Sequence, residues 1–321
     1  MAADVVTIGT ASCPPGSIAR GLIEVARGPN GSIMGFPVLI VNGALAGPRL
    51  CLAAGIHGDE YEGMEAVRRT VLAANPATLR GALIGLPCVN PPAFEAASRS
   101  SGIDHLNLNR IFPGSAAGTL SQRWAARFVE EVIPNIDALV DLHTGGGFGE
   151  IVPLTVLQTG FEELATGLAR AMGHKVLWKG GKWGGTARIS TLQAGKPAVT
   201  CEIAGGGYQE ETVARHTKSL QNAMRYFGLI DGQPEIPEEY QVVNGTFAYS
   251  GTGGFFRPEV APGALVKAGD PIGRVLSHWG DEVEQCAAPT DGMVLWIRKR
   301  AAIFPGEEVV IFGEILEVIR R

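Results

Sequence analysis

The chain has 321 residues, with 27 lysines and arginines against 32 aspartates and glutamates, which gives a formal net charge of −5. Hydrophobic residues make up 45% of the sequence and charged residues only 18%, which excludes a disordered chain and suffices for a large buried core. The mildly acidic balance argues against a nucleic-acid-binding groove, which needs a basic face. No apolar run reaches the length of a membrane span. We therefore expect neither nucleic acid nor a membrane as a partner.

The cysteines indicate the compartment. They are odd in number, widely spaced and without a CxxC pair, and four of them lie in apolar or strand-like runs; the five are Cys13, Cys51, Cys88, Cys201 and Cys286. This usage is typical of small core residues in a reducing compartment. Residues 1–15 lack the basic start and apolar stretch of a signal peptide. The sequence therefore predicts a cytoplasmic protein.

Apolar runs of strand length alternate with segments of helical spacing over the first 230 residues. The predicted strands are 38–42, 50–55, 83–89, 138–142, 152–156 and 198–203. The predicted helices are 61–74, 120–133, 161–172 and 209–229. Near-continuous apolar strands between amphipathic helices predict an α/β fold with a mixed, largely parallel sheet that helices flank on both faces.

The character of the sequence changes around residues 231–239, a polar segment with two prolines that follows the last predicted helix. We place a domain boundary there, between a catalytic domain (1–232) and a β-sandwich domain (240–321). The second part has no helical period and predicts short strands at 245–249, 264–266, 272–276, 293–298, 308–312 and 315–319. It resembles the lipoyl/biotinyl-type β-sandwich, but its only lysines, Lys267 and Lys299, lie away from the turn that carrier domains modify.

The first candidate site residues are His57 and Glu60 in the run AAGIHGDEYEG. They lie three residues apart, directly after a predicted strand and at the start of a predicted helix, so that both side chains can converge on one metal ion. The pair alone is weak evidence, because a loop histidine near a helix-capping acid gives the same pattern.

His143, in VDLHTGGG, follows a second predicted strand. Together His57, Glu60 and His143 form the His₂Glu ligand complement of a catalytic zinc, one Zn²⁺ per chain, with a fourth position open for water. Asp141, two residues earlier, is either an outer partner of this site or simply an acid at a strand end.

Glu202, in VTCEIAGGG, closes a third apolar strand and has no basic partner nearby in sequence. A buried acid normally needs such a partner, so a role as general base beside the zinc site is the better explanation. The alternative is a salt bridge to a distant arginine.

The connection 90–114 is longer than connections usually are unless they are functional. It carries Arg99, Asn107, Asn109 and Arg110. An arginine beside an asparagine suits a substrate carboxylate, and a second arginine can stabilise an oxyanion. The alternative is that these side chains form hydrogen bonds that order the loop. All four segments follow predicted strands, and ligands of open α/β sheets bind outside the carboxyl ends of the strands.

The runs HGDE, NLNRIFPG, DLHTGG and CEIAGGG, in this order, resemble the succinylglutamate desuccinylase/aspartoacylase family of the zinc-carboxypeptidase group. The resemblance covers essentially the whole chain, since members also carry a β-rich C-terminal domain. The run NPPAF…R…D…NLNR is closer to the branch with the N-acetyl-diaminobutyrate deacetylases than to aspartoacylase.

This resemblance implies a zinc amidohydrolase that removes an acyl group from a small N-acylated amino acid or related amide. It implies zinc ligation by His57, Glu60 and His143, a general base in Glu202, and a substrate carboxylate held by Asn109 and Arg110. Arg99 would face the scissile carbonyl or a carboxylate. Arg188, in GGTARIS, is the counterpart of a later family arginine. The family's pocket tyrosine has three candidates here: Tyr208, Tyr240 and Tyr249.

Two other functions remain open from the sequence. One is a zinc carboxypeptidase that acts on peptides in an open groove. The other is a non-catalytic small-molecule binding protein built around the lipoyl-like tail. The acyl group, the amine and the oligomeric state are undetermined, and a homo-oligomer is compatible with an enzyme of this kind.

Overall fold

The structure is a computed structural model that describes residues 4–180 and 184–320. Its strands are β1 (Val6–Ile8), β2 (Ala11–Cys13), β3 (Ser17–Arg27), β4 (Ile33–Asn42), β5 (Leu45–Ala54), β6 (Arg80–Leu86), β7 (Ala138–His143), β8 (Gly149–Gln158), β9 (Val176–Gly180), β10 (Ala198–Ala204), β11 (Glu239–Tyr249), β12 (Gly254–Pro258), β13 (Leu265–Val266), β14 (Pro271–Leu276), β15 (Glu282–Ala287), β16 (Gly292–Arg298), β17 (Ala302–Ile303) and β18 (Glu308–Arg320). Its α-helices are α1 (Tyr61–Ala73), α2 (Pro91–Glu95), α3 (Leu120–Glu131), α4 (Glu162–Ala171), α5 (Ala187–Gln193) and α6 (Glu210–Tyr226), and its short 3₁₀ helices are η1 (Leu108–Arg110), η2 (Ile133–Asn135) and η3 (Gly146–Phe148).

The centre of the molecule is a block of four adjacent parallel strands in the order β6-β5-β7-β10. β6, β7, β10 and the second half of β5 are almost wholly buried and largely apolar, as strands covered on both faces must be. Antiparallel pairings flank the block on both sides, through β4 next to β6 and through β8 next to β10. The predicted mixed α/β fold is confirmed, and each predicted strand and helix of the first 230 residues overlaps an observed one. The expectation of a largely parallel sheet holds for this block and for β8, β9 and β11, whereas the other pairings of the sheet are antiparallel.

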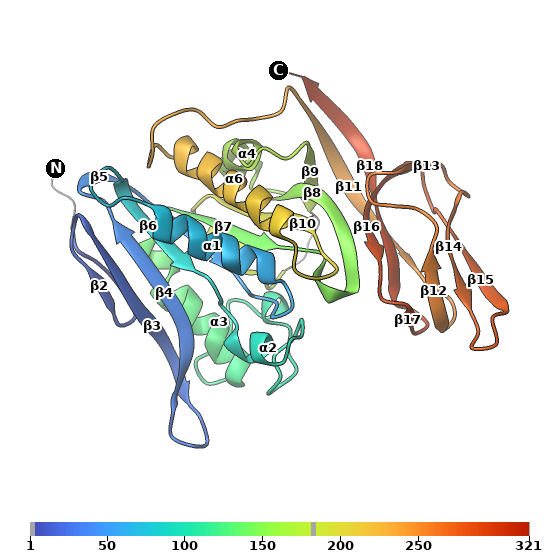
Figure 1. Cartoon of the computed structure of the whole chain (residues 1–321), viewed down its shortest axis with the longest axis horizontal. Helices are drawn as coiled ribbons and strands as arrows, with labels where there is room; N and C mark the ends of the chain where they lie inside the picture. Colours follow the sequence, from blue (N-terminus) through green and yellow to red (C-terminus); the bar gives the residue numbers. More distant parts are fainter. Residues whose placement is uncertain (1–3, 181–183, 321) are drawn as a thin grey trace.

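Helices cover this block on both faces (Figure 1). On one face α1 lies beside α6, and α6 beside α4; on the other, α3 contacts α5. Helix α1 shows why the pattern predicts a helix: Met64, Val67 and Val71, spaced by three and four residues, are buried.

The C-terminal strands continue the central sheet. β11 pairs in parallel with β9, and β16 pairs with the first residues of β8. Together they form one sheet with the strand order β13-β16-β18-β11-β9-β8-β10-β7-β5-β6-β4-β3. A separate four-stranded sheet consists of β12, β14, β15 and β17. It packs against β16 and β18 of the large sheet, and an apolar core lies between them. Figure 1 shows this all-β part on the side of the molecule where β8 and β9 lie.

Several elements had no predicted counterpart. They include the N-terminal strands up to Arg27, the short β9 and α5, and three of the C-terminal strands. The predicted strands 308–312 and 315–319 are one continuous strand, β18, because Gly313 and Glu314 stay paired with β11. Short elements and strands whose residues are half exposed lack the periodicity that makes an element visible in sequence.

Candidate functional site

The predicted site residues meet at one edge of the parallel block. His57 follows β5, His143 is the last residue of β7, and Glu202 lies near the end of β10. Glu202 is the register partner of His143 on the neighbouring strand. Because the three strands are adjacent and parallel, their carboxyl ends bring these side chains to one place.

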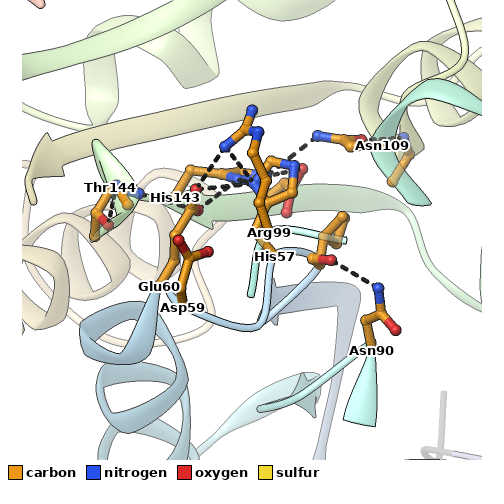
Figure 2. A network of polar contacts seen from close by, with 12 residues as sticks. His57, Asp59, Glu60, Asn90, Arg99, Asn109, His143 and Thr144 are labelled. Carbon is orange, nitrogen blue, oxygen red and sulfur yellow. Dashed lines mark hydrogen bonds and ion pairs between the residues drawn. The ribbon is translucent and has the colours of Figure 1, made fainter. Parts of the chain in front are cut away.

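His57, Glu60 and His143 form a compact buried cluster (Figure 2). Nδ1 of His57 lies 2.8 Å from Oε1 of Glu60, and Nδ1 of His143 lies 2.8 Å from Oε2 of the same carboxylate. The two Nδ1 atoms are 3.1 Å apart. Each residue is only 2% exposed. Two imidazole nitrogens and a carboxylate converging in this way can hold a metal ion.

The outer nitrogens of both histidines have partners that fix the rings. Nε2 of His143 donates to Oδ2 of Asp141 at 2.9 Å, and Nε2 of His57 donates to Oδ1 of Asn107 at 3.2 Å. The orientation of the Asn107 amide is set by a second donor, the backbone N–H of Asn109. With the Nε2 protons in these bonds, both Nδ1 atoms can present a lone pair to a metal.

The residues of the cluster shift one another's pKa values. Burial and the nearby Arg99 lower the pKa of His57 to about 3. Burial alone would lower the pKa of His143 too, but the carboxylates of Asp141 and Glu60 hold it well above its usual value. Burial would raise the pKa of Glu60, yet the two histidines hold it well below its ordinary value. Glu60 is therefore an anion, as a metal ligand must be.

Glu202 lies beside the cluster and lines the same cavity. Burial raises its pKa to about 8, an effect that His143 opposes and Glu60 reinforces. Within the described residues its carboxylate forms no hydrogen bond or ion pair, so the alternative of a salt bridge to a distant arginine is not what the structure shows. A carboxylate with a raised pKa beside a metal-binding cluster suits proton transfer near neutral pH.

The connection 90–114 folds over the cluster. Nη1 of Arg99 donates to Oε1 of Glu60 at 3.1 Å and lies 3.2 Å from Nδ1 of His57. Oδ1 of Asn109 accepts a hydrogen bond from the N–H of Ala187, which leaves its Nδ2 near His143. Arg110 is more exposed and donates to the carbonyl of Asn109. Arg99, Asn109 and Arg110 all line the cavity.

Arg188, at the start of α5, also reaches the cavity, and it is only 5% exposed. Its Nε and Nη1 have no hydrogen-bond partner among the described residues. Burial lowers its pKa to about 10, although the charges of Asp141 and Glu202 oppose this. Buried donors without partners are costly, which indicates that an anionic group of a ligand pairs with them.

The structure separates the three candidate tyrosines. Tyr208 is exposed and donates to Glu210, and the buried Tyr240 donates to the carbonyl of Arg170. Tyr249, on β11, lines the cavity.

The cavity has a volume of about 480 Å³, and much of its wall had not been assigned from the sequence. The wall residues outside the predicted set are partly aromatic (Phe148, Trp178, Phe247 and Trp296) and partly polar (Thr144, Arg298, Glu307 and Glu308). Phe247, Trp296, Arg298, Glu307 and Glu308 belong to the all-β part of the chain, whose contact with the catalytic edge cannot be inferred from local pattern.

Two glycines explain how the loops of the site approach each other. A Cβ atom on Gly58 would lie 1.9 Å from the backbone of Ala93, so the segment with His57 and Glu60 can pack against α2 only without a side chain. Gly205 has a φ of +132° and lies against the carbonyl of Gly149. The glycine-rich turns after His143 and Glu202 thus pack together at the floor of the site.

A comparison with protein families matches residues 46–227 to the succinylglutamate desuccinylase/aspartoacylase catalytic domain. This segment runs from β5 to the end of α6 and is more than half of the chain. The chain belongs to the succinylglutamate desuccinylase/aspartoacylase family. Its predicted membership is confirmed. The matched segment contains the predicted metal ligands, Glu202, Asn109 and the predicted arginines, but of the three candidate tyrosines only Tyr208.

Among curated family members, the chain is 30% identical to the N-alpha-acetyl-L-2,4-diaminobutyric acid deacetylase of Halomonas elongata, over 89% of this chain and 87% of that protein. Among solved structures, it resembles the product-bound ectoine utilization protein EutE of Ruegeria pomeroyi, with a TM-score of 0.87 and 26% identity over 97% of this chain and 98% of that one. It also resembles an aspartoacylase family protein from Mesorhizobium loti, with a TM-score of 0.82 and 25% identity over 99% of each chain. These matches include the C-terminal strands as well as the family's catalytic domain.

Helices of this family member, within the ranges that the structure describes, are too short or too polar to cross a bilayer.

Proposed function

We propose that the protein is a zinc-dependent amidohydrolase that removes the acyl group from a small N-acylated amino acid or a related amide. One observation carries this proposal: a single cavity is lined by the two histidines of the His57/Glu60/His143 cluster, by the carboxylate of Glu202 and by four arginines, among them Arg99, Arg110 and Arg188. Metal ligands, a proton acceptor and anion-binding groups are the parts that hydrolysis of an N-acyl amino acid requires.

The donor set fits zinc. Two imidazole nitrogens and one carboxylate are the ligands of a catalytic zinc with an open position, and both rings are held by outer partners. His57, Glu60 and His143 would hold the ion. Zinc bound here would supply Lewis acidity, which lowers the pKa of water and polarises the scissile carbonyl.

Side chains of the protein carry out the proton transfers and stabilise the developing charge. Glu202 accepts the proton of the attacking water and returns it to the leaving amine. Arg99, whose Nη1 lies beside Glu60, stabilises the negative charge that develops on the carbonyl oxygen. The products are the free carboxylic acid and the free amino acid.

We assign the substrate carboxylate to Arg188, Asn109 and Arg110. Arg188 brings buried donors that have no partner among the described residues, and Asn109 presents Nδ2 beside the metal ligands. Arg110 lies further out, where burial and Arg99 lower its pKa. The relative from Halomonas acts on an acetylated diamino acid, so N-acetyl-2,4-diaminobutyrate is the first substrate to test.

The placement of the C-terminal strands supports a small substrate over a peptide. β11, β16 and β18 supply one wall of the cavity, including Phe247, Trp296 and Ile311. An open groove for a polypeptide, as a carboxypeptidase needs, would require that wall to be absent. We propose a catalytic domain over residues 1–232 and a lipoyl-like β-sandwich over 240–321, which limits the size of the substrate rather than carrying a modified lysine.

We also propose that the protein acts in the cytoplasm. All five cysteines are free thiols and four are buried, which supports a reducing compartment.

The test is zinc content together with release of free amine from a panel of N-acetyl and N-succinyl amino acids and dipeptides. We expect about one zinc per chain and hydrolysis of an N-acyl amino acid that a chelator abolishes. Faster cleavage of dipeptides than of every N-acyl amino acid would favour the carboxypeptidase instead. A protein that binds no zinc would refute the proposal.

A further inference from the structure

A β-bulge turns an acidic side chain into the cavity from the C-terminal wall. β11 and β18 are antiparallel, with Phe247 opposite Ile311 and Ala248 opposite Val310. The next pair skips Val309, so that Tyr249 lies opposite Glu308. In a regular strand Val309 would share the face of Ile311; the extra residue puts Glu308 there instead. Glu308, Tyr249, Phe247 and Ile311 all line the cavity.

The bulge also lets two consecutive valines, Val309 and Val310, be buried in the core of the β-sandwich. A bulge beside a site commonly redirects a side chain, and this one replaces an apolar wall residue by a carboxylate. Because both valines stay in the apolar core, the bulge places Glu308 at the cavity without putting a polar side chain into that core.

Two neighbouring acids differ in their partners. Oε2 of Glu307 accepts hydrogen bonds from Nη2 of the buried Arg298 at 2.8 Å and from the N–H of Phe304 at 2.9 Å, which tie Glu307 into the turn before β18. The carboxylate of Glu308 has neither a hydrogen bond nor an ion pair within the described residues, although the charges of Arg110 and Arg298 are close enough to interact with it. Glu307 is therefore structural, and Glu308 is available to a ligand.

The rings around Glu308 suit a cation. Tyr249 stacks on Phe247 with ring centroids 6.3 Å apart, and Phe247 lies 6.3 Å from Trp178. Aromatic faces attract ammonium groups, and a partly desolvated carboxylate adds a charged hydrogen-bond acceptor. Arg99, Arg188 and the two histidines of the metal cluster line the same cavity, so one ligand can meet cationic groups as well as the carboxylate of Glu308.

We infer that Glu308 determines substrate specificity by binding a positively charged amine on the side chain of the N-acyl amino acid. Arg188, Asn109 and Arg110 bind the α-carboxylate, and Arg99 faces the carbonyl of the scissile amide. Glu308 binds an ammonium group a few bonds away. The substrate class is thus an N-acyl diamino acid. This inference rests on the proposed deacylase function and narrows it.

The experiment uses the zinc-loaded full chain and three substrates that share the acyl group that the wild-type protein accepts best. They are the Nα-acyl derivatives of 2,4-diaminobutyrate, of norvaline, in which a methyl group replaces the ammonium, and of glutamate. We expect kcat/KM to be about 10- to 100-fold higher for diaminobutyrate than for norvaline, as for one charged hydrogen bond. Glu308→Gln should remove that preference through KM, with kcat nearly unchanged, and should leave the norvaline derivative within about threefold of wild type.

Glu314→Gln is the matched control, because Glu314 lies on the same strand, is exposed and is outside the cavity. Glu314→Gln should leave kcat/KM unchanged for all three substrates. Equal loss on diaminobutyrate and norvaline in Glu308→Gln would overturn the inference and show a structural role, and so would an unchanged preference. Failure of the wild-type protein to hydrolyse any N-acyl amino acid would instead refute the proposed function itself, which this experiment reveals before any variant is made.

Discussion

The carboxylate of Asp141 lies 2.9 Å from Nε2 of His143, on the side of the ring opposite the Nδ1 atom that faces Glu60. Asp141 is fully buried, and it precedes His143 by two residues on β7, so both side chains leave the same face of the strand. The sequence left Asp141 open between an outer partner and an acid at a strand end. The geometry makes it the partner that orients the ring.

We expect Asp141→Asn to weaken zinc binding by about 10- to 100-fold, because a neutral amide neither holds the His143 proton as strongly nor raises the basicity of the ring. Competition with a chromogenic chelator measures this directly. Asn107→Ala is the comparison at His57, where the partner is already a neutral amide at 3.2 Å, and its effect should be smaller. Equal zinc affinity in wild type and Asp141→Asn would show that the bond has no role in metal binding.

Glu202→Gln should lower kcat by about 10²- to 10⁴-fold, the usual contribution of a general base, since the amide cannot accept a proton. Zinc content should remain at the wild-type level because Glu202 lies outside the His57/Glu60/His143 cluster. Turnover and metal analysis of the same preparation check both statements. Glu202→Gln with near-normal turnover would exclude the role as proton acceptor.

Much of the fold was predictable because its central strands are apolar throughout and its long helices are amphipathic. The run 50–55 and the helix at Tyr61–Ala73 are examples, since burial on both faces or on one stripe leaves a clear period. Pairing between distant strands leaves no such mark. Neither the parallel contact of β11 with β9 nor the pairing of β16 with β8 can be inferred from local residues.

The same distinction applies to the site. His57, His143 and Glu202 could be grouped from sequence because each follows a core strand, and strand ends share an edge. Tyr249 could not be separated from Tyr208 and Tyr240, since only the docking of β11 decides which ring faces the cavity. Glu308 was invisible because its orientation depends on a one-residue bulge.

Arg188→Met should raise KM for N-acyl amino acids by about 10- to 100-fold, because it removes the buried donors that we assign to the substrate carboxylate. The corresponding amino acid amide, which lacks that carboxylate, should be hydrolysed by wild type and variant at similar kcat/KM. Steady-state kinetics on the acid and the amide form the test. A variant with normal KM on the acid would exclude Arg188 from binding the carboxylate and leave Asn109 and Arg110 as its partners.

The last prediction concerns stability and a histidine remote from the cavity. His174, just before β9, is buried, with Nδ1 beside the hydroxyl of Thr155 at 2.9 Å and Nε2 beside that of Ser219 at 3.1 Å. Burial lowers its pKa from 6.5 to about 4. Between these two pH values the unfolded chain binds a proton at this site and the folded chain does not, so acidification favours unfolding.

His174 therefore stabilises the fold fully above about pH 6.5, and its contribution is lost as the pH falls toward 4. Each pH unit in that interval is worth about 1.4 kcal/mol, so the free energy of unfolding should fall by up to about 3 kcal/mol from this residue. Urea denaturation of wild type and His174→Gln between pH 7 and pH 5 measures the difference. The variant should be less stable at pH 7 but lose less stability on acidification, whereas the exposed His278→Gln should follow wild type. Parallel pH curves for wild type and His174→Gln would show that this histidine titrates alike in the folded and the unfolded chain.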